Sequence, residues 1–308
     1  MSQKLRGAVI GVGYLGTFHA QKVAAHAGAE LVAVFDHFPE QAQKVATSLK
    51  TEAVQNLEEI AKNVDFVTIA ASTQAHYELA KFFLEKQIPV LVEKPIAATA
   101  AQGKQLSELA DKNKVIFSVG HIERFNPAYN YLQENFNKTK YLEINRLAPF
   151  RVRGSDVSVL HDLMIHDLDL VNFIFKQKIK KHIISGNKLI RPTIDDVSLR
   201  LELESGTQVT IQNSRLSPQI IRNYRAIQSD CTLFVNTATL EGEFLYSDPA
   251  HESLMRTEKV QIPKVDALAL EIDHFISAVR KEKPVAITGF EATTALEQIE
   301  NFIQELNH

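Results

Sequence analysis

The amino-acid sequence predicts an α/β protein, in which an N-terminal doubly wound parallel sheet precedes a C-terminal α+β domain with a large, mostly antiparallel open sheet. Over residues 7–119, short apolar runs alternate with amphipathic helical runs, the pattern of a parallel sheet covered on both faces. Beyond Gly120 strand-like runs dominate, which favours an antiparallel sheet with helices on one face. We therefore expect two domains, residues 1–120 and residues 121–308.

The first domain is expected to alternate strands and helices along its whole length. Its strand candidates are short and apolar throughout: residues 7–10, 30–35, 64–70, 89–92 and 115–119. Its helix candidates carry apolar residues at helical spacing: residues 14–26, 39–49, 74–85 and 98–112. Because crossovers between parallel strands are right-handed, such a chain forms one sheet with helices on both faces.

The second domain is expected to build its sheet mainly from antiparallel strands: residues 141–147, 179–185, 197–204, 207–214, 225–229, 232–236 and 239–246. Gly206 marks a tight hairpin turn between two of them. The helix candidates are residues 126–136, 159–175, 265–280 and 291–306, and they leave one face of the sheet uncovered. We expect that face to join copies of the chain into a homo-oligomer, a dimer or a tetramer.

Composition excludes several classes of protein. The 308 residues carry a net charge of −3, whereas nucleic-acid binders and polybasic membrane-surface proteins need a cationic face. The one cysteine, Cys231, permits neither an intramolecular disulfide nor a cysteine metal cluster. The N-terminal apolar run is short and interrupted by glycines, and no stretch approaches the roughly 18 apolar residues of a membrane span. We therefore expect a soluble, cytoplasmic protein that binds neither nucleic acid nor membrane.

The segment Gly-Val-Gly-Tyr-Leu-Gly at residues 11–16 follows a predicted strand and opens a predicted helix. Gly11 permits a tight turn, Gly13 lets a pyrophosphate approach the backbone, and Gly16 lets helix and strand pack closely. The helix N-terminus supplies N–H groups and a dipole that attract an anion. This context indicates the dinucleotide-binding loop of a Rossmann domain, although the same glycines could be simple turn residues.

Asp36 ends the next strand, 20 residues after Gly16. A carboxylate at this point accepts hydrogen bonds from the ribose hydroxyls and repels a 2′-phosphate, which favours NAD over NADP. His37 follows and can also meet the ribose edge. The alternative reading makes Asp36 a helix cap, but strand, loop, helix and acid together favour dinucleotide binding.

Lys94 lies in the segment Leu-Val-Glu-Lys-Pro at residues 91–95, at the carboxyl end of a strand, where ligands of such sheets bind. A lysine there can reach across the nicotinamide to a substrate hydroxyl and act as a proton donor or a base. The simpler alternative is an exposed lysine at a strand end.

The glycine loop, Asp36 and the segments at residues 70–76 and 90–97 together resemble the Gfo/Idh/MocA family of oxidoreductases, over essentially the whole chain. The resemblance implies a Rossmann domain followed by an α/β domain whose open sheet often mediates oligomerisation. It makes Lys94 the lysine of the family's EKP motif and implies a cis peptide before Pro95.

The residues expected to contact the cofactor lie at or just beyond strand ends: Gly11, Gly13, Tyr14, Leu15, Gly16, Asp36, His37, Ala71, Ser72, Thr73, His76, Glu93, Lys94 and His121. The family usually has Thr-Pro where this chain has Ser72-Thr73. His121 follows a strand and is expected near the mouth of the cofactor site.

The predicted helix 159–175 carries a run of histidines and carboxylates. Asp162, His166 and Asp169 are spaced i, i+4 and i+7, so they project from one face. A histidine beside a carboxylate is an oriented base that titrates near neutrality. The family's D-x-x-x-H pair maps onto Asp162 and His166, and the resemblance implies that Lys94, Asp162 and His166 surround the reacting carbinol.

Two other readings of this helix stay open. The histidines could satisfy neighbouring carboxylates structurally, or His166 could share a metal ion with Asp162 or Asp169. Together with the N-terminal half, the pattern favours catalysis, and we expect no metal site.

Residues 120–128, GHIERFNPA, and residues 162–170, DLMIHDLDL, resemble a narrower branch of the family that oxidises the 3-hydroxyl of UDP-N-acetylglucosamine with NAD. The 3-keto product is of the kind that is aminated for lipid A. Arginines suit the pyrophosphate of such a substrate. Besides Lys94 and His166, the expected substrate ligands are Arg124, Arg151, Arg153 and Arg215, with Arg222 and Arg225 as weaker candidates. The alternative for Arg124 is a salt bridge to Glu123 or another acid.

The sequence therefore predicts an NAD-dependent dehydrogenase acting on a CH–OH group of a small-molecule sugar or sugar nucleotide. His166 would remove the hydroxyl proton while Lys94 stabilises the alkoxide, although either of the two could be the base. The alternatives are a dehydrogenase or reductase for a free sugar, a cyclitol or another carbonyl compound, and a non-catalytic NAD-sensing protein.

Overall fold

The computed structural model describes residues 3–136, 138–152 and 157–307. The chain divides into two compact units. Met1–Ile122 and Asp266–Glu297 form the first, and Glu123–Val265 and Gln298–His308 form the second. The first long segment ends close to the expected boundary at residue 120, but Asp266–Glu297, expected in the second domain, belongs to the first unit.

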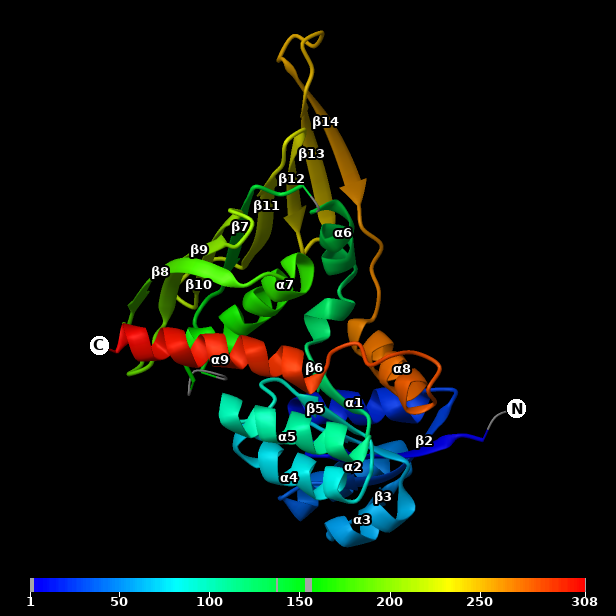
Figure 1. The fold of residues 1–308 in the computed structure, drawn as a ribbon. Coiled ribbons are helices and arrows are strands. Elements are labelled where there is room, and N and C mark those ends of the chain that lie inside the picture. The colour runs from blue at the N-terminus through cyan, green and yellow to red at the C-terminus, as the bar shows by residue number, and fades with distance from the viewer. Residues whose placement is uncertain (1–2, 137, 153–156, 308) are drawn as a thin grey trace. The chain divides into compact units, whose positions relative to one another are not determined.

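The first unit contains a six-stranded parallel sheet with the order β3-β2-β1-β4-β5-β6 (Figure 1). Its strands are β1 (Leu5–Ile10), β2 (Ala29–Phe35), β3 (Glu52–Ala53), β4 (Phe66–Ile69), β5 (Val90–Glu93) and β6 (Phe117–Gly120). The doubly wound parallel sheet predicted from the sequence is confirmed. The sequence analysis missed β3, because two residues are too few to show a strand periodicity.

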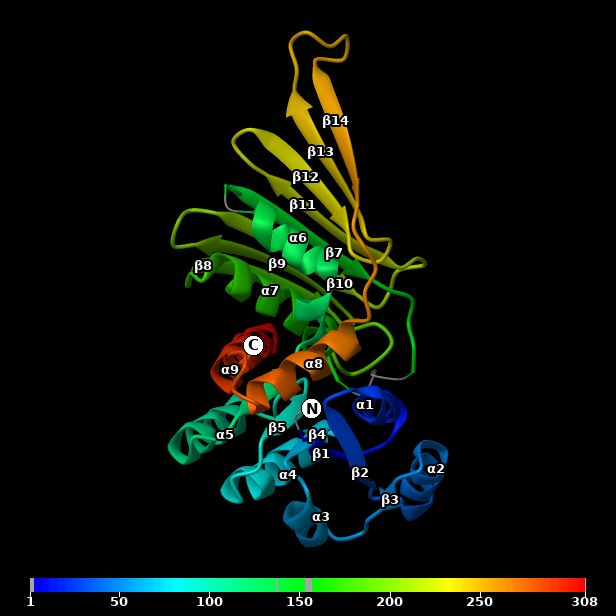
Figure 2. The ribbon, with the colours of Figure 1, turned by 90° about the vertical axis from the view of Figure 1, so that its right-hand side faces the viewer.

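Helices cover both faces of this sheet: α1 (Tyr14–Ala25), α2 (Pro39–Leu49), α3 (Leu57–Asn63), α4 (Thr73–Glu85) and α5 (Ala100–Asn113). Within the unit, α1 and α2 lie on one face, and α4 and α5 lie side by side on the other (Figure 2). The side chains of Asn56 and Thr99 cap the N-termini of α3 and α5 by accepting backbone N–H groups.

Helix α8 (Ala267–Val279) joins the first unit through its apolar face. Leu268, Ile272, Phe275 and Ile276 belong to one buried core with residues of α1, β1 and β2. The ring of Phe275 meets the ring of Phe66 edge to face, with 5.7 Å between centroids. This burial explains why a helix far along the chain packs beside α1.

The second unit contains an eight-stranded sheet with the order β14-β13-β12-β11-β7-β10-β9-β8. Its strands are β7 (Tyr141–Leu147), β8 (Ile179–Asn187), β9 (Asp196–Leu203), β10 (Gln208–Ser214), β11 (Ile221–Ile227), β12 (Cys231–Asn236), β13 (Glu241–Ser247) and β14 (Met255–Gln261). The sheet is mostly antiparallel, as predicted, but β7 and β10 pair in parallel, which was not predicted. Strand β14 was not predicted, because its residues are almost all exposed and show no alternation of apolar and polar residues.

Helices α6 (Pro127–Asn135) and α7 (Ile165–Phe175) lie against one face of this sheet (Figure 2). Alternate strand residues such as Val197, Leu199 and Leu201 are fully buried, as expected for a sheet covered on one side. The chain ends in α9 (Gly289–Leu306), which begins in the first unit and ends in the second.

The predicted helix 159–175 is present with one change. Its first turn, Leu160–Met164, is a π-helix, and the α-helix α7 follows it directly. Single π turns occur often at functional sites. Asp162 lies in the π turn and His166 in α7.

Within the described residues, every helix is too short or too polar to cross a lipid bilayer.

Candidate active site

The glycine loop has the geometry that a dinucleotide requires. Gly11 has a φ of +82°, and a Cβ there would lie 2.6 Å from the backbone of Ala71. A Cβ on Gly16 would lie 1.8 Å from the carbonyl oxygen of Gly11. Gly13 differs, because a Cβ there would meet no atom within 4 Å. The loop is thus packed closely around Gly11 and Gly16 and leaves open space at Gly13, at the start of α1, where a pyrophosphate fits.

Asp36 fastens the glycine loop to the end of β2. Its Oδ2 accepts the N–H of Val12 at 2.8 Å, and its Oδ1 accepts the N–H of Phe38 at 3.0 Å. The carboxyl group is buried and α2 begins only at Pro39, so Asp36 is not the cap of that helix. Each carboxylate oxygen keeps a second lone pair, so contact with a ribose stays a prediction. Tyr14 and His37 are exposed, and Leu15 is half-buried.

The segment Ala71–Thr73 lies at the end of β4, with Ala71 directly against Gly11. His76, one turn into α4, is buried and contacts two carbonyl oxygens, that of Pro95 with Nδ1 at 2.9 Å and that of Ala71 with Nε2 at 3.1 Å. Burial lowers the pKa of His76, against the opposing effect of these two contacts. His76 thus ties the loop after β4 to the loop after β5, and its contact with the cofactor stays a prediction.

Lys94 follows β5 directly, and the Lys94–Pro95 peptide is cis, as the resemblance implies. The Lys94 residue is half-buried. Glu93 is buried and its carboxylate accepts the backbone N–H of Lys94 at 3.2 Å and contacts His19 of α1. The side chain of Glu93 therefore faces the interior of the unit, and its expected contact with the cofactor stays a prediction. His121 is fully buried directly after β6.

The second unit contains a hollow of about 370 Å³ that brings several of the predicted substrate residues together. Asp162 and His166 line it side by side with Arg151, Arg215 and Arg222. Ala148, Pro149, Leu163 and Ile220 supply its apolar wall. A base, a carboxylate and cationic groups around one hollow can bind an anionic substrate and move a proton.

The arginines that line this hollow differ in how deeply they are buried and in the groups that they contact. Arg215 is buried, donates from Nη2 to the carbonyl oxygen of Val157 at 2.7 Å, and has Nε 3.7 Å from Asp195. Arg151 and Arg222 are exposed. Arg153 lies outside the described residues. Arg225 is not among the lining residues and pairs with Glu143.

Arg124 has a structural partner inside the second unit. Its Nε and Nη2 donate to the two carboxylate oxygens of Asp169 at 2.8 and 2.7 Å, and its guanidinium lies 4.6 Å from the ring centroid of Phe173. Both ends of this pair are buried. Of the two readings of Arg124, the salt bridge is observed, with Asp169 as the acid. Asp169 therefore turns to Arg124, and Asp162 is the carboxylate that lines the hollow with His166.

Arg146 of β7, which lines the hollow, was not predicted from the sequence. It is buried and donates to Asp167 at 2.9 Å, to Glu123 at 3.0 Å, and to the hydroxyls of Tyr129 and Tyr224 at 2.7 and 3.0 Å. Burial opposes its charge, but Asp167 and its other partners outweigh burial and raise the pKa of Arg146 well above the ordinary value. The signal was present, because residue 146 alternates in phase with the buried Leu142 and Ile144.

Glu123 is the other charged lining residue that was not predicted. Burial would raise the pKa of its carboxyl group, but the charges of Arg146 and Arg222 outweigh burial and lower it. Glu123 therefore stays ionised and holds both guanidinium groups at this end of the hollow, with 3.6 Å to Arg222.

Comparisons with known proteins identify the family and support the fold. Residues 5–121 match the family model described as "Oxidoreductase family, NAD-binding Rossmann fold", and residues 141–232 match the "GFO/IDH/MocA C-terminal domain". The UDP-N-acetylglucosamine 3-dehydrogenase of Acidithiobacillus ferrooxidans is 33% identical over 290 residues, covering 92% of each chain. Its solved structure has a TM-score of 0.91, covering 97% of this chain and 96% of that one. An inositol 2-dehydrogenase of Rhizobium meliloti is 25% identical over 316 residues, covering 95% of this chain and 94% of its own.

Proposed function

Because this chain belongs to the GFO/IDH/MocA family of oxidoreductases, we propose that it oxidises the 3-hydroxyl group of UDP-N-acetylglucosamine and passes the hydride to NAD. Its relatives are dehydrogenases of CH–OH groups, and the chain is an enzyme of that class with an NAD-binding Rossmann fold. The 33% identity to a relative named for this substrate supports the choice of substrate.

The observation that carries the proposal is the hollow of the second unit. A sugar nucleotide has a diphosphate, and the exposed guanidinium groups of Arg151 and Arg222 border the same hollow as Asp162 and His166. A cyclitol or a free hexose has no anionic group for these arginines. The inositol dehydrogenases among the relatives make a cyclitol the second candidate.

NAD is the proposed cofactor, with NADP disfavoured. Bound NAD supplies the hydride acceptor. The open space at Gly13 and the N-terminus of α1 would hold its pyrophosphate, and the carboxylate of Asp36 at the end of β2 would hold a ribose and repel a 2′-phosphate. Ser72 and Thr73, at the start of α4, would border the same loop.

We assign the proton chemistry to three residues. His166 removes the proton of the substrate hydroxyl, and Asp162 orients its imidazole or shares the proton. Lys94, at the end of β5, donates a hydrogen bond to the developing alkoxide and stabilises its charge.

The experiment is a substrate panel with the purified chain. NAD and UDP-N-acetylglucosamine together are expected to give the near-ultraviolet absorbance of NADH, while UDP-glucose, myo-inositol and glucose give far less. Turnover of myo-inositol without turnover of the UDP-sugar would instead establish a cyclitol dehydrogenase. Tight NADH binding with no turnover across the panel would establish a cofactor-sensing protein.

We also propose that the chain forms a homo-oligomer through the face of the eight-stranded sheet opposite α6 and α7. This face carries a shallow hollow of about 780 Å³ lined by Phe234, Glu243 and Lys259 among others. Light scattering of the wild type and of Phe234→Glu tests it, because a carboxylate at the centre of such an interface is expected to yield monomers.

A further inference from the structure

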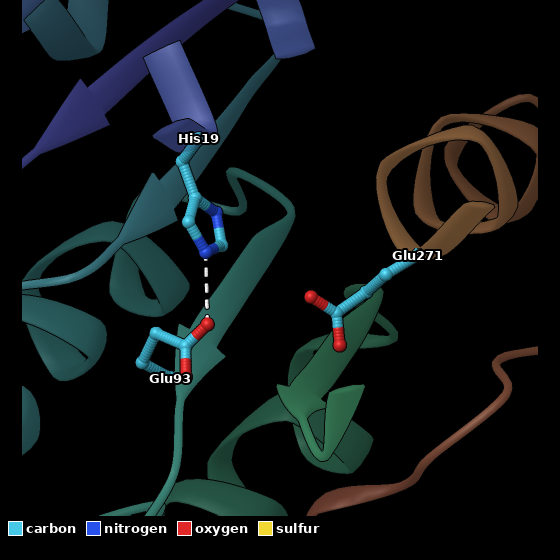
Figure 3. A group of neighbouring side chains, drawn as sticks. All are labelled: His19, Glu93 and Glu271. Carbon is cyan, nitrogen blue, oxygen red and sulfur yellow. Dashed lines mark hydrogen bonds and ion pairs between the residues drawn. The ribbon is translucent and has the colours of Figure 1, made fainter. Parts of the chain in front are cut away.

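Three ionisable side chains from distant parts of the sequence meet inside the first unit. His19 of α1, Glu93 of β5 and Glu271 of α8 are all buried, and one ligand atom of each lies within 4.8 Å of the other two. Figure 3 shows the carboxylate of Glu271 directed toward His19 and Glu93. We call these three residues the α1–β5–α8 cluster.

The hydrogen bonds of the cluster are incomplete. His19 Nε2 and Glu93 Oε1 are 2.8 Å apart, and Glu93 Oε2 accepts the backbone N–H of Lys94. Among the residues that the structure describes, the two carboxylate oxygens of Glu271 have no hydrogen-bond partner. The same holds for His19 Nδ1. A buried polar atom in that condition is rare in folded proteins and needs an explanation.

The charges of the cluster demand a positive partner. Two carboxyl groups are buried against each other, and an uncompensated carboxylate in such a place costs several kcal/mol. Burial and the charge of Glu93 raise the pKa of Glu271 well above its ordinary value. The cluster therefore holds either a proton or a cation at Glu271.

The donor set and spacing favour a cation. Two ligands that are each about 2.0–2.6 Å from an ion lie up to about 5 Å apart, and the cluster satisfies that limit. One imidazole nitrogen and two carboxylate oxygens suit divalent first-row metals such as Zn²⁺. The backbone also makes room for these groups, because a Cβ on Gly120 would lie only 2.9 Å from Glu93 Oε1.

We propose that the α1–β5–α8 cluster binds one divalent transition-metal cation. Its two positive charges neutralise Glu93 and Glu271, and it replaces the proton that otherwise neutralises Glu271. The site joins the helix behind the glycine loop, the strand that directly precedes Lys94, and a helix from the far end of the sequence. The cation thus stabilises the first unit by cross-linking α1, β5 and α8, and this role does not depend on which substrate the protein uses.

The test is a Zn²⁺ titration of the full-length chain after treatment with EDTA, in a Cys231→Ala background that removes the free thiol. One Zn²⁺ per chain is expected. Glu271→Gln, which keeps the shape but loses the charge, is expected to lower the affinity by about tenfold or more. The matched control is Glu305→Gln, because His182 and Glu305 form a more exposed His–Glu pair, 2.6 Å apart.

Thermal unfolding gives a second readout, since a cation that binds the folded state raises its melting temperature. Zn²⁺ is expected to raise the melting temperature of the wild type and of Glu305→Gln, but not that of Glu271→Gln. If the wild type binds no stoichiometric Zn²⁺, or if Glu271→Gln binds it equally well, the cluster holds only a proton and the proposal is wrong. Either result leaves the substrate panel unaffected, so the two proposals fail separately.

Discussion

Arg146 of β7 and Asp167 of α7 form an ion pair that is almost completely buried, with 2.9 Å between Nη2 and Oδ1. Asp167 also accepts hydrogen bonds from Asn213 at 2.7 Å and from Tyr224 at 2.9 Å. It is the residue next to His166, which lines the hollow. This network therefore anchors α7, which carries the proposed base, to strands of the sheet beneath it.

Asp167→Ala is expected to destabilise the protein by about 3–5 kcal/mol, because it leaves the buried charge of Arg146 with only Glu123 to balance it. Urea unfolding measures this. The matched control is Asp230→Ala, which removes an exposed pair with Lys138 at the same 2.9 Å distance and is expected to change nothing measurable. Equal effects of the two substitutions would contradict the importance of burial.

Lys94→Met is expected to lower kcat by about 10²–10⁴-fold while NAD still binds, because the ammonium group acts on the alkoxide and not on the adenosine half. Turnover assays and NAD titration measure the two effects. Lys104→Met, on an exposed face of α5, is the control and is expected to retain full turnover. Full turnover of Lys94→Met would remove Lys94 from the mechanism.

Gly13→Ala is expected to fold normally but to bind NAD about tenfold or more weakly, because its methyl group meets no protein atom and enters the space left for the pyrophosphate. Gly16→Ala is expected to lower stability as well, since its Cβ would lie 1.8 Å from the carbonyl oxygen of Gly11. Melting temperatures and NAD titration together separate the two effects. Unchanged NAD affinity in Gly13→Ala would place the pyrophosphate elsewhere.

Arg222→Gln is expected to raise KM for UDP-N-acetylglucosamine by about 10–100-fold, the worth of a charge-assisted hydrogen bond, with little effect on kcat. Arg225→Gln is the control, because it lies three residues further along β11 and therefore on the opposite face of the sheet. Steady-state kinetics at two salt concentrations test this. A similar change in both variants would indicate a general charge effect.

Glu271→Gln is expected to change how stability depends on pH in EDTA-treated protein. The pKa of Glu271 is raised in the folded state by burial and by Glu93, so the folded state holds a proton that the unfolded state releases above about pH 4.5. Its stabilising contribution is complete below that pH and is lost as pH rises toward the raised pKa. The variant should therefore gain stability relative to the wild type as pH increases. Urea unfolding across pH 4–8 measures the difference, and a constant difference would contradict it.

Several features of the fold follow from neighbouring residues alone. Apolar runs and helical spacing predict most strands and helices of both units, and the glycine pattern at residues 11–16 predicts the turn geometry found at Gly11. Lys94 at a strand end and the histidine-rich helix were also found in this way, because both signals are local.

The residue type alone could not predict which group each arginine contacts. Arg124 and Arg222 look alike in the sequence, yet Arg124 is buried against Asp169 and Arg222 borders the hollow. Arg146 carries a signal in its strand phase, but its partners come from four other elements. Long-range packing decides which arginine is buried against an acid and which borders the hollow.

The sequence by itself determined the parallel and antiparallel sheets, the cofactor loop and the candidate base, because periodicity and turn chemistry depend on residues that are close along the chain. Only the tertiary structure decided that α8 returns to the first unit, and that Glu271 meets His19 and Glu93 there. An apolar helix face predicts that the helix is buried on that side, but it does not identify the surface against which the helix packs. That choice depends on the burial of surfaces far apart in the sequence, and it placed a buried carboxyl group beside the strand that directly precedes Lys94.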